Sequence, residues 1–123
     1  DRNSGPAVQY SHARACSILR KAGRRGGKHP SDVFKLPEEG RLIKLLAKFP
    51  GIVREAGERL QPNLPALYAA ELALVFNTFY EVAPVIEAGA PELRAARLRL
   101  VNCVRIVLRN ALDLMGITAP ERM

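Results

Sequence analysis

Apolar positions recur along the chain at the three- and four-residue spacing of an α-helix, and no stretch alternates apolar and polar residues as a half-buried strand would. Proline, glycine and other turn residues separate the helical stretches from one another. The pattern predicts an all-α helical bundle of about five helices, over residues 6–22, 38–49, 50–60, 64–89 and 91–115.

Three of these helices have one strongly apolar face, as a helix that packs into a core must. In the first helix this face holds Val8, His12, Ala15, Cys16, Leu19 and Ala22. In the fourth it holds Tyr68, Leu72, Val75, Phe76, Phe79, Val82 and Ala83. In the last it holds Leu93, Ala96, Leu100, Val104, Val107, Leu108, Ala111 and Met115. We expect Pro84 to kink the fourth helix near its end and Gly116 to stop the last one.

One charge interrupts the apolar face of the last helix. Arg97 falls in the middle of that face, where a buried charge without a partner is costly. We expect its guanidinium either to extend to the surface or to pair with Glu71 or Glu81 of the preceding helix.

The 123 residues suffice for one domain with a sizeable core, and no apolar run is long enough to span a membrane. The net charge of +7 is concentrated at the two ends: residues 1–30 hold seven Lys or Arg and one acid, and residues 91–123 hold six and three. A polyanionic partner would explain this asymmetry, with nucleic acid ahead of a membrane, and a merely solvated basic surface is the alternative.

The sequence contains no motif of enzymatic chemistry. Cys16 and Cys103 lie far apart without metal-ligand spacing and are expected to be buried free thiols. His12 belongs to an apolar helix face, so a packing role is expected rather than catalysis. Residues 23–37, with three glycines and two prolines, predict a long loop, and their run "GRRGGKH" is a candidate RNA contact rather than a phosphate-cradling loop.

Four stretches, taken in order, carry a resemblance to a known family. They are "VQYSHARACSILRKAG" from Val8, "EEGRLIKLLAKFPGIVREAGERLQPNLPALYAAELALVFNTFYE" from Glu38, "RLRLVNCVRIVLRNALDLMGI" from Arg97, and the final "PERM". Together they resemble the C-terminal anticodon-binding (DALR) domain of arginyl-tRNA synthetase. The short motif that names the domain is reduced here to "AARL" at residues 95–98.

The resemblance implies that residues 1–123 form a single anticodon-binding domain of a longer synthetase, an expectation that fits a chain beginning at Asp1 without an initiator methionine. An upstream core with HIGH-type and KMSKS-type signatures would bind ATP and arginine and attach the amino acid. The domain itself would have no catalytic residue, metal or cofactor. The implied partners are arginine tRNA and the protein's own catalytic core, without a membrane, in a cytoplasmic protein that is a monomer.

The resemblance also implies which residues contact the anticodon. They are Arg14 of "HAR", Tyr80 of "FNTFY" and Met123 of "PERM", together with Tyr10, Gln9 and Asn77. Arg14, Tyr10 and Lys21 share one face of the first helix. The candidate phosphate contacts are Lys21, Arg24, Arg25, Arg94, Arg105 and Arg109, of which the last three follow one flank of the last helix. The final residues would fold back over the bundle to bring the side chain and carboxylate of Met123 to the loop bases.

Several alternatives stay open at this stage. Tyr80 lies at the border of its apolar stripe, so it either presents its ring outward or anchors packing, and the final residues either fold back or fray. Relatives commonly have an aromatic residue where this chain has Ala7, so Tyr10 or the 24–36 loop would have to replace it. The chain could also be the equivalent domain of another class I synthetase, such as the cysteinyl enzyme, or a helical protein-interaction module.

Overall fold

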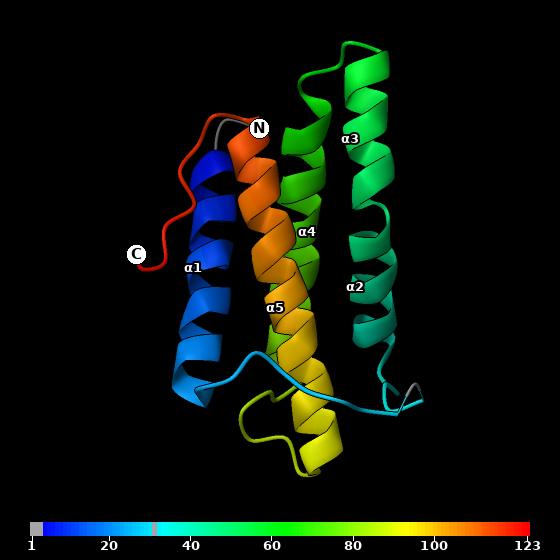
Figure 1. Ribbon diagram of the computed structural model, residues 1–123, viewed down its shortest axis with the longest axis vertical. Helices are drawn as coiled ribbons and strands as arrows, with labels where there is room; N and C mark the ends of the chain where they lie inside the picture. Colours follow the sequence, from blue (N-terminus) through cyan, green and yellow to red (C-terminus); the bar gives the residue numbers. More distant parts are fainter. Residues whose placement is uncertain (1–3, 31) are drawn as a thin grey trace.

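The computed structural model describes residues 4–30 and 32–123, and they fold into an all-helical bundle (Figure 1). The helices are α1 (Ser4–Ala22), α2 (Pro37–Ala47), α3 (Phe49–Glu58), α4 (Leu64–Val82) and α5 (Pro91–Leu114). Helix α4 packs against all four others, with α1 and α5 on one side and the α2–α3 arm on the other. The predicted class and the number of helices are therefore confirmed.

The α2–α3 arm consists of two helices that meet end to end at Lys48. We predicted that Pro50 would end the first of them, but α2 already stops at Ala47 and Pro50 lies in the first turn of α3. Proline fits there because the first N–H groups of a helix have no intrahelical acceptor to lose. Counted as one kinked arm, α2 and α3 leave four helical columns in the bundle (Figure 1).

Helix α4 ends at Val82 instead of continuing through a kink at Pro84. Ala83 adopts an extended conformation, φ −119° and ψ 96°, as expected of a residue whose following proline disfavours the helical region. The prediction of a kinked helix over 64–89 was therefore wrong at its C-terminal end. The predicted burial of Val82 was also wrong, because this side chain is 47% exposed.

The core contains most of the predicted apolar faces. Tyr68, Leu72, Phe76 and Phe79 of α4 are buried, and the Tyr68 hydroxyl donates a hydrogen bond to the carbonyl of Leu45 at 2.7 Å. The core also takes in the expected small and branched residues of α5, which are Ala96, Leu100, Val104, Leu108 and Ala111. The cysteines differ from the prediction of two buried thiols, because Cys16 is partly buried and Cys103 is exposed.

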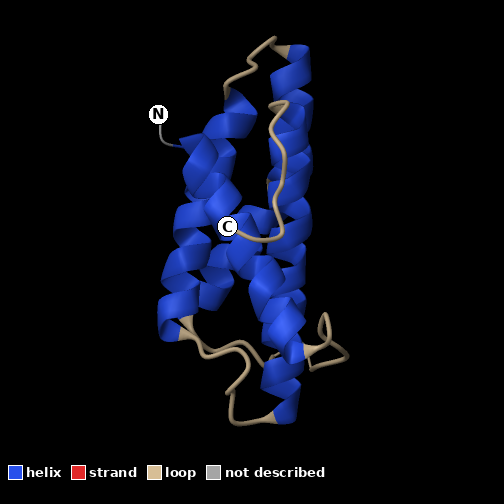
Figure 2. Cartoon of the chain, turned by 90° about the vertical axis from the view of Figure 1, so that its left-hand side faces the viewer, coloured by secondary structure: helices blue, strands red, loops and turns tan. Residues whose placement is uncertain are grey.

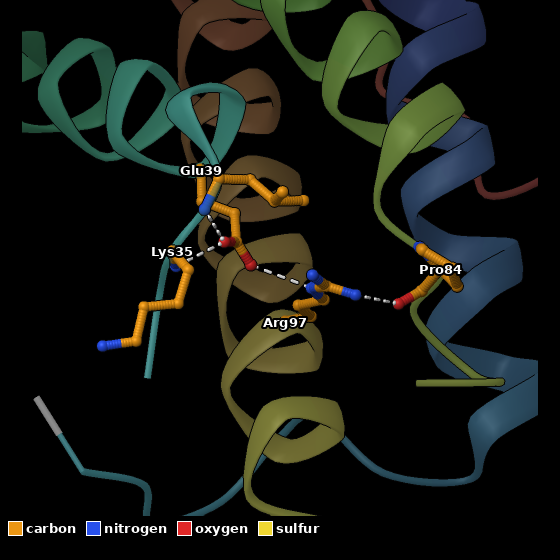
Figure 3. Close-up of polar contacts among 5 residues, drawn as sticks. Lys35, Glu39, Pro84 and Arg97 are labelled. Carbon is orange, nitrogen blue, oxygen red and sulfur yellow. Dashed lines mark hydrogen bonds and ion pairs between the residues drawn. The ribbon is translucent and has the colours of Figure 1, made fainter. Parts of the chain in front are cut away.

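The buried Arg97 pairs with Glu39 of α2 (Figure 3). Its Nε donates to Glu39 Oε2 at 2.8 Å, and its Nη1 donates to the carbonyl of Pro84, also at 2.8 Å. The predicted partners Glu71 and Glu81 are exposed, so that expectation was wrong. Arg97 therefore ties α2 to α5 and holds the segment that follows α4.

Candidate nucleic-acid interface

Residues 117–123, called here the C-terminal tail, fold back along α1 (Figure 2). The reversal starts at Gly116, whose φ of +72° suits glycine, and the N–H of Ile117 returns to the carbonyl of Leu112 at 2.9 Å to close a Schellman motif. Two side chains of α1 then hold the tail. Gln9 donates to the Thr118 carbonyl at 2.9 Å, and His12 Nδ1 lies 2.7 Å from the Pro120 carbonyl.

The contact with the tail shows which ring nitrogen of His12 carries a proton. A carbonyl oxygen only accepts, so Nδ1 carries the proton of this hydrogen bond. Burial lowers the pKa of His12 by more than the hydrogen bond to the Pro120 carbonyl raises it, and the positive charges of Arg105 and Arg109 lower it further. The ring is thus favoured as a neutral imidazole that packs in the core and anchors the tail, which confirms the predicted packing role.

The tail forms one wall of a groove, called here the tyrosine groove, whose other walls are α1 and the C-terminal end of α4 with the residues after it. From α1 it takes Tyr10, Ala13, Arg14, Ser17, Ile18, Arg20 and Lys21; from α4 and beyond, Tyr80, Glu81, Pro84, Val85, Ile86 and Glu87; from the tail, Glu121, Arg122 and Met123. Its volume of about 1100 Å³ is slightly above the upper limit of the range of about 300–1,000 Å³ that is typical of sites for one small molecule.

Three of the predicted residues, Arg14, Asn77 and Tyr80, form a connected set of contacts, and two of them, Arg14 and Tyr80, line this groove. Arg14 Nη1 donates to Asn77 Oδ1 at 3.2 Å, and its guanidinium carbon lies 5.1 Å from the centre of the Tyr80 ring. That distance is within the range of a cation–π contact. Asn77 thus orients Arg14, and Arg14 lies over the Tyr80 ring.

Three large side chains of the groove, two aromatic rings and one thioether, are well exposed to solvent. Tyr10 is 57% exposed, Tyr80 42% and Met123 67%. Tyr80 is therefore partly buried, and part of its ring is open to solvent. Because both tyrosine rings reach solvent beside arginine and lysine side chains, the groove can stack planar groups and attract anions together.

Gln9, a predicted anticodon contact, does not lie in the tyrosine groove. Its amide is engaged with the tail carbonyl of Thr118. The structure thus gives it a part in placing the tail, a part that the sequence did not suggest. Ser17 and Glu121 line the groove without having been expected; Ser17 could have been found, because it continues the helical face of Tyr10, Arg14 and Lys21.

The predicted basic residues divide into three groups. Lys21 lines the tyrosine groove. Four of them line a second groove, called here the arginine groove, together with Arg20, His12, Cys16, Leu19, Gly23 and Glu121: they are Arg24, Arg25, Arg105 and Arg109. Arg94 lines neither groove, but its Nε donates to the carbonyl of Ile86, a lining residue of the tyrosine groove, at 3.0 Å. Of the three arginines on this flank of α5, Arg105 and Arg109 line one groove, and Arg94 does not line it.

Among residues 4–30 and 32–123, no three His, Cys, Asp or Glu side chains lie together so as to hold a metal ion. None of the helices in the described part of the chain is both long and apolar enough to cross a membrane.

The chain is similar in sequence and in structure to proteins of one known family. Residues 8–123 match the DALR anticodon binding domain. The whole chain is 48% identical to part of the arginine–tRNA ligase of Methanosarcina barkeri, and 98% of it is 51% identical to part of that of Pyrococcus abyssi. In the solved structure of Thermus thermophilus arginyl-tRNA synthetase, the matching region is 42% identical over 97% of the chain, with a TM-score of 0.88. The chain spans about a fifth of the length of these relatives, from 20% to 22%.

Proposed function

The chain belongs to the DALR anticodon-binding domain family found in arginine–tRNA ligases, and from this premise we propose that its tyrosine groove receives the unpaired bases of the anticodon loop of arginine tRNA. Residues 1–123 then form one recognition domain of a longer ligase, located in the cytoplasm as a monomer. The rest of that ligase binds ATP and arginine and attaches the amino acid to the tRNA that this domain has selected.

The observation that carries the proposal is the meeting of three distant segments in one groove. Arg14 comes from α1, Tyr80 from the end of α4 and Met123 from the tail. Arg14 lies over the Tyr80 ring, and the hydrogen bond between His12 and the Pro120 carbonyl holds the tail that carries Met123. Unpaired nucleotides are recognised by stacking on aromatic and guanidinium planes and by hydrogen bonds to the exposed edges of the bases. The groove supplies surfaces of both kinds.

Each residue has a distinct part in this proposal. Tyr80 offers a ring on which a base stacks, while Arg14, oriented by Asn77, offers hydrogen bonds and charge. Met123 supplies a polarisable thioether on the opposite wall. Tyr10 provides a second exposed ring on the α1 side. This ring replaces the aromatic side chain that relatives commonly have at the position of Ala7.

A direct test compares two complete tRNAs. We expect the chain to bind arginine tRNA at least about tenfold more tightly than a tRNA for another amino acid, because one hydrogen bond between a charged group such as the Arg14 guanidinium and a base edge contributes about 1.5–3 kcal/mol. Fluorescence anisotropy at fixed ionic strength measures both affinities. Equal affinities would mean that only nonspecific attraction to a basic surface remains.

A further inference from the structure

The arginine groove lies beside the tail, between the C-terminal end of α1 and the middle of α5. Arg20, Arg24 and Arg25 approach from α1 and the residues that follow it, and Arg105 and Arg109 approach from α5. The only acid in its lining is Glu121 of the tail. Five positive charges against one negative charge make this groove strongly electropositive.

The charge of these arginines is not neutralised within the described part of the chain. The one ion pair among residues 4–30 and 32–123 joins Glu39 to Arg97, and neither of these residues lines this groove. Arg24 and Arg105 make hydrogen bonds only to neutral acceptors, the carbonyl of Gly26 and the side chain of Asn102. Clustered like charges repel one another, so the arrangement favours an anionic ligand that would neutralise them.

A close backbone contact holds the two sides of the groove together. Gly26, with φ +103°, lies so near α5 that a Cβ added to it would come within 2.6 Å of the backbone nitrogen of Arg99. The segment bearing Arg24 and Arg25 is thus packed directly on the helix that carries Arg105. This packing places the arginines of the two elements around one groove.

The groove lacks the aromatic rings on which unpaired bases stack. No tyrosine, phenylalanine or tryptophan lines it, and the ring of His12 is only 2% exposed and bonded to Pro120. Guanidinium groups without an aromatic platform bind phosphate oxygens, which fix the register of a nucleic acid without reporting its sequence. The arginine groove and the tyrosine groove are therefore chemically complementary.

We propose that the arginine groove is a second RNA site, which binds backbone phosphates of the same RNA whose unpaired bases occupy the tyrosine groove. The inference rests on the proposed function. Arg20 and Glu121 line both grooves, so the two sites adjoin at the tail. Base recognition on one side of the tail and phosphate binding on the other thus act on one continuous strand.

The test uses the double variant Arg105→Gln/Arg109→Gln and the anticodon stem-loop of arginine tRNA, titrated at several potassium chloride concentrations. Loss of two phosphate contacts is expected to make the slope of log K against log salt shallower by about 1.4–1.8, since each contact contributes about 0.7–0.9. Phosphate contacts carry no sequence information, so the ratio of affinities for the cognate and an altered loop should not change. The matched control is Arg54→Gln/Arg59→Gln, which removes two exposed arginines at α3.

An unchanged slope, or an equal change in the control variant, overturns the second site. A small-anion site is the other reading, and inorganic phosphate tests it: if it raises the melting temperature of the parent chain but not of the variant, while the RNA slopes coincide, the RNA assignment is wrong. Equal binding of the parent chain to cognate and altered loops would instead refute base recognition in the tyrosine groove, and the slope comparison would still report on the arginines.

Discussion

Replacing Glu39 with alanine is expected to lower the free energy of unfolding by about 3–5 kcal/mol, the range seen when one member of a buried ion pair is removed. Glu39 is fully buried, and both of its carboxylate oxygens are used. Oε2 accepts from Arg97, and Oε1 accepts from the backbone N–H groups of Lys35 and Leu36 at 3.1 and 2.9 Å (Figure 3). The variant loses the start of α2 and leaves a buried guanidinium without its counter-ion.

Chemical denaturation followed by circular dichroism measures this effect, and Glu71→Ala is the matched control. Glu71 is an exposed carboxylate on α4, so its removal should change the unfolding free energy by no more than about 0.5 kcal/mol. If Glu71→Ala cost as much as Glu39→Ala, or if both were near neutral, the buried pair would not stabilise the bundle as described. The double variant Glu39→Ala/Arg97→Met should lose less unfolding free energy than the two single variants together. Each single variant leaves one buried charge unpaired, whereas the double variant removes both charges.

Tyr80→Ala is expected to weaken binding of the arginine anticodon stem-loop by about 5- to 150-fold, which corresponds to the 1–3 kcal/mol of one stacked base. The ring is the reason: it is partly exposed and lies beneath the Arg14 guanidinium, and truncation removes the stacking surface and leaves Arg14 without that contact. Tyr80→Phe keeps the stacking ring, so its affinity should stay within about threefold of the parent chain, a difference of about 0.7 kcal/mol or less. Binding is measured by fluorescence anisotropy.

Two controls separate a lost contact from a lost fold. Circular dichroism should show unchanged helix content in Tyr80→Ala, because the side chain lies at the surface of the bundle. Arg54→Ala, on α3, should leave the affinity close to that of the parent chain at moderate salt, since α3 packs on the far side of α4 from the groove. An affinity for Tyr80→Ala equal to that of the parent would remove this residue from the recognition surface.

The helices were predictable because their signals are local. Apolar spacing within one helix fixes which face is buried, and Tyr10, Arg14 and Lys21 were assigned to one face in the same way; all three line one groove. The end of α4 was misplaced because two local effects compete at Pro84: proline can kink a helix, but it also disfavours the helical conformation of the preceding Ala83, and the second effect prevails.

The ion pair shows where one-dimensional patterns stop being informative. Periodicity identified Arg97 as a charge on an apolar face, but the acid that reaches it lies 58 residues away on α2. Which carboxylate becomes its partner depends on how α2 packs beside α5 and α4, and the spacing of residues along one helix does not encode that arrangement.

The site was predictable only in part for a related reason. Arg14, Tyr80 and Met123 were brought together by a family resemblance, since no spacing rule connects residues on α1, α4 and the tail. The path of the tail depends on hydrogen bonds from Gln9 and His12 to backbone carbonyls, which every residue possesses and which therefore leave no mark in the sequence. The division of the arginines between two grooves follows from that path.

The most direct measurement of the central claim uses one anticodon stem-loop and changes only its anticodon bases. The affinity of the chain for the arginine anticodon stem-loop is compared with that for the same stem carrying substituted anticodon bases, at one salt concentration, so that charge and backbone are identical. If the tyrosine groove reads unpaired bases, the substituted loop should bind about tenfold or more weakly, since one lost hydrogen bond between a charged group such as the Arg14 guanidinium and a base edge corresponds to about 1.5–3 kcal/mol. Equal affinities for the two loops would contradict the claim.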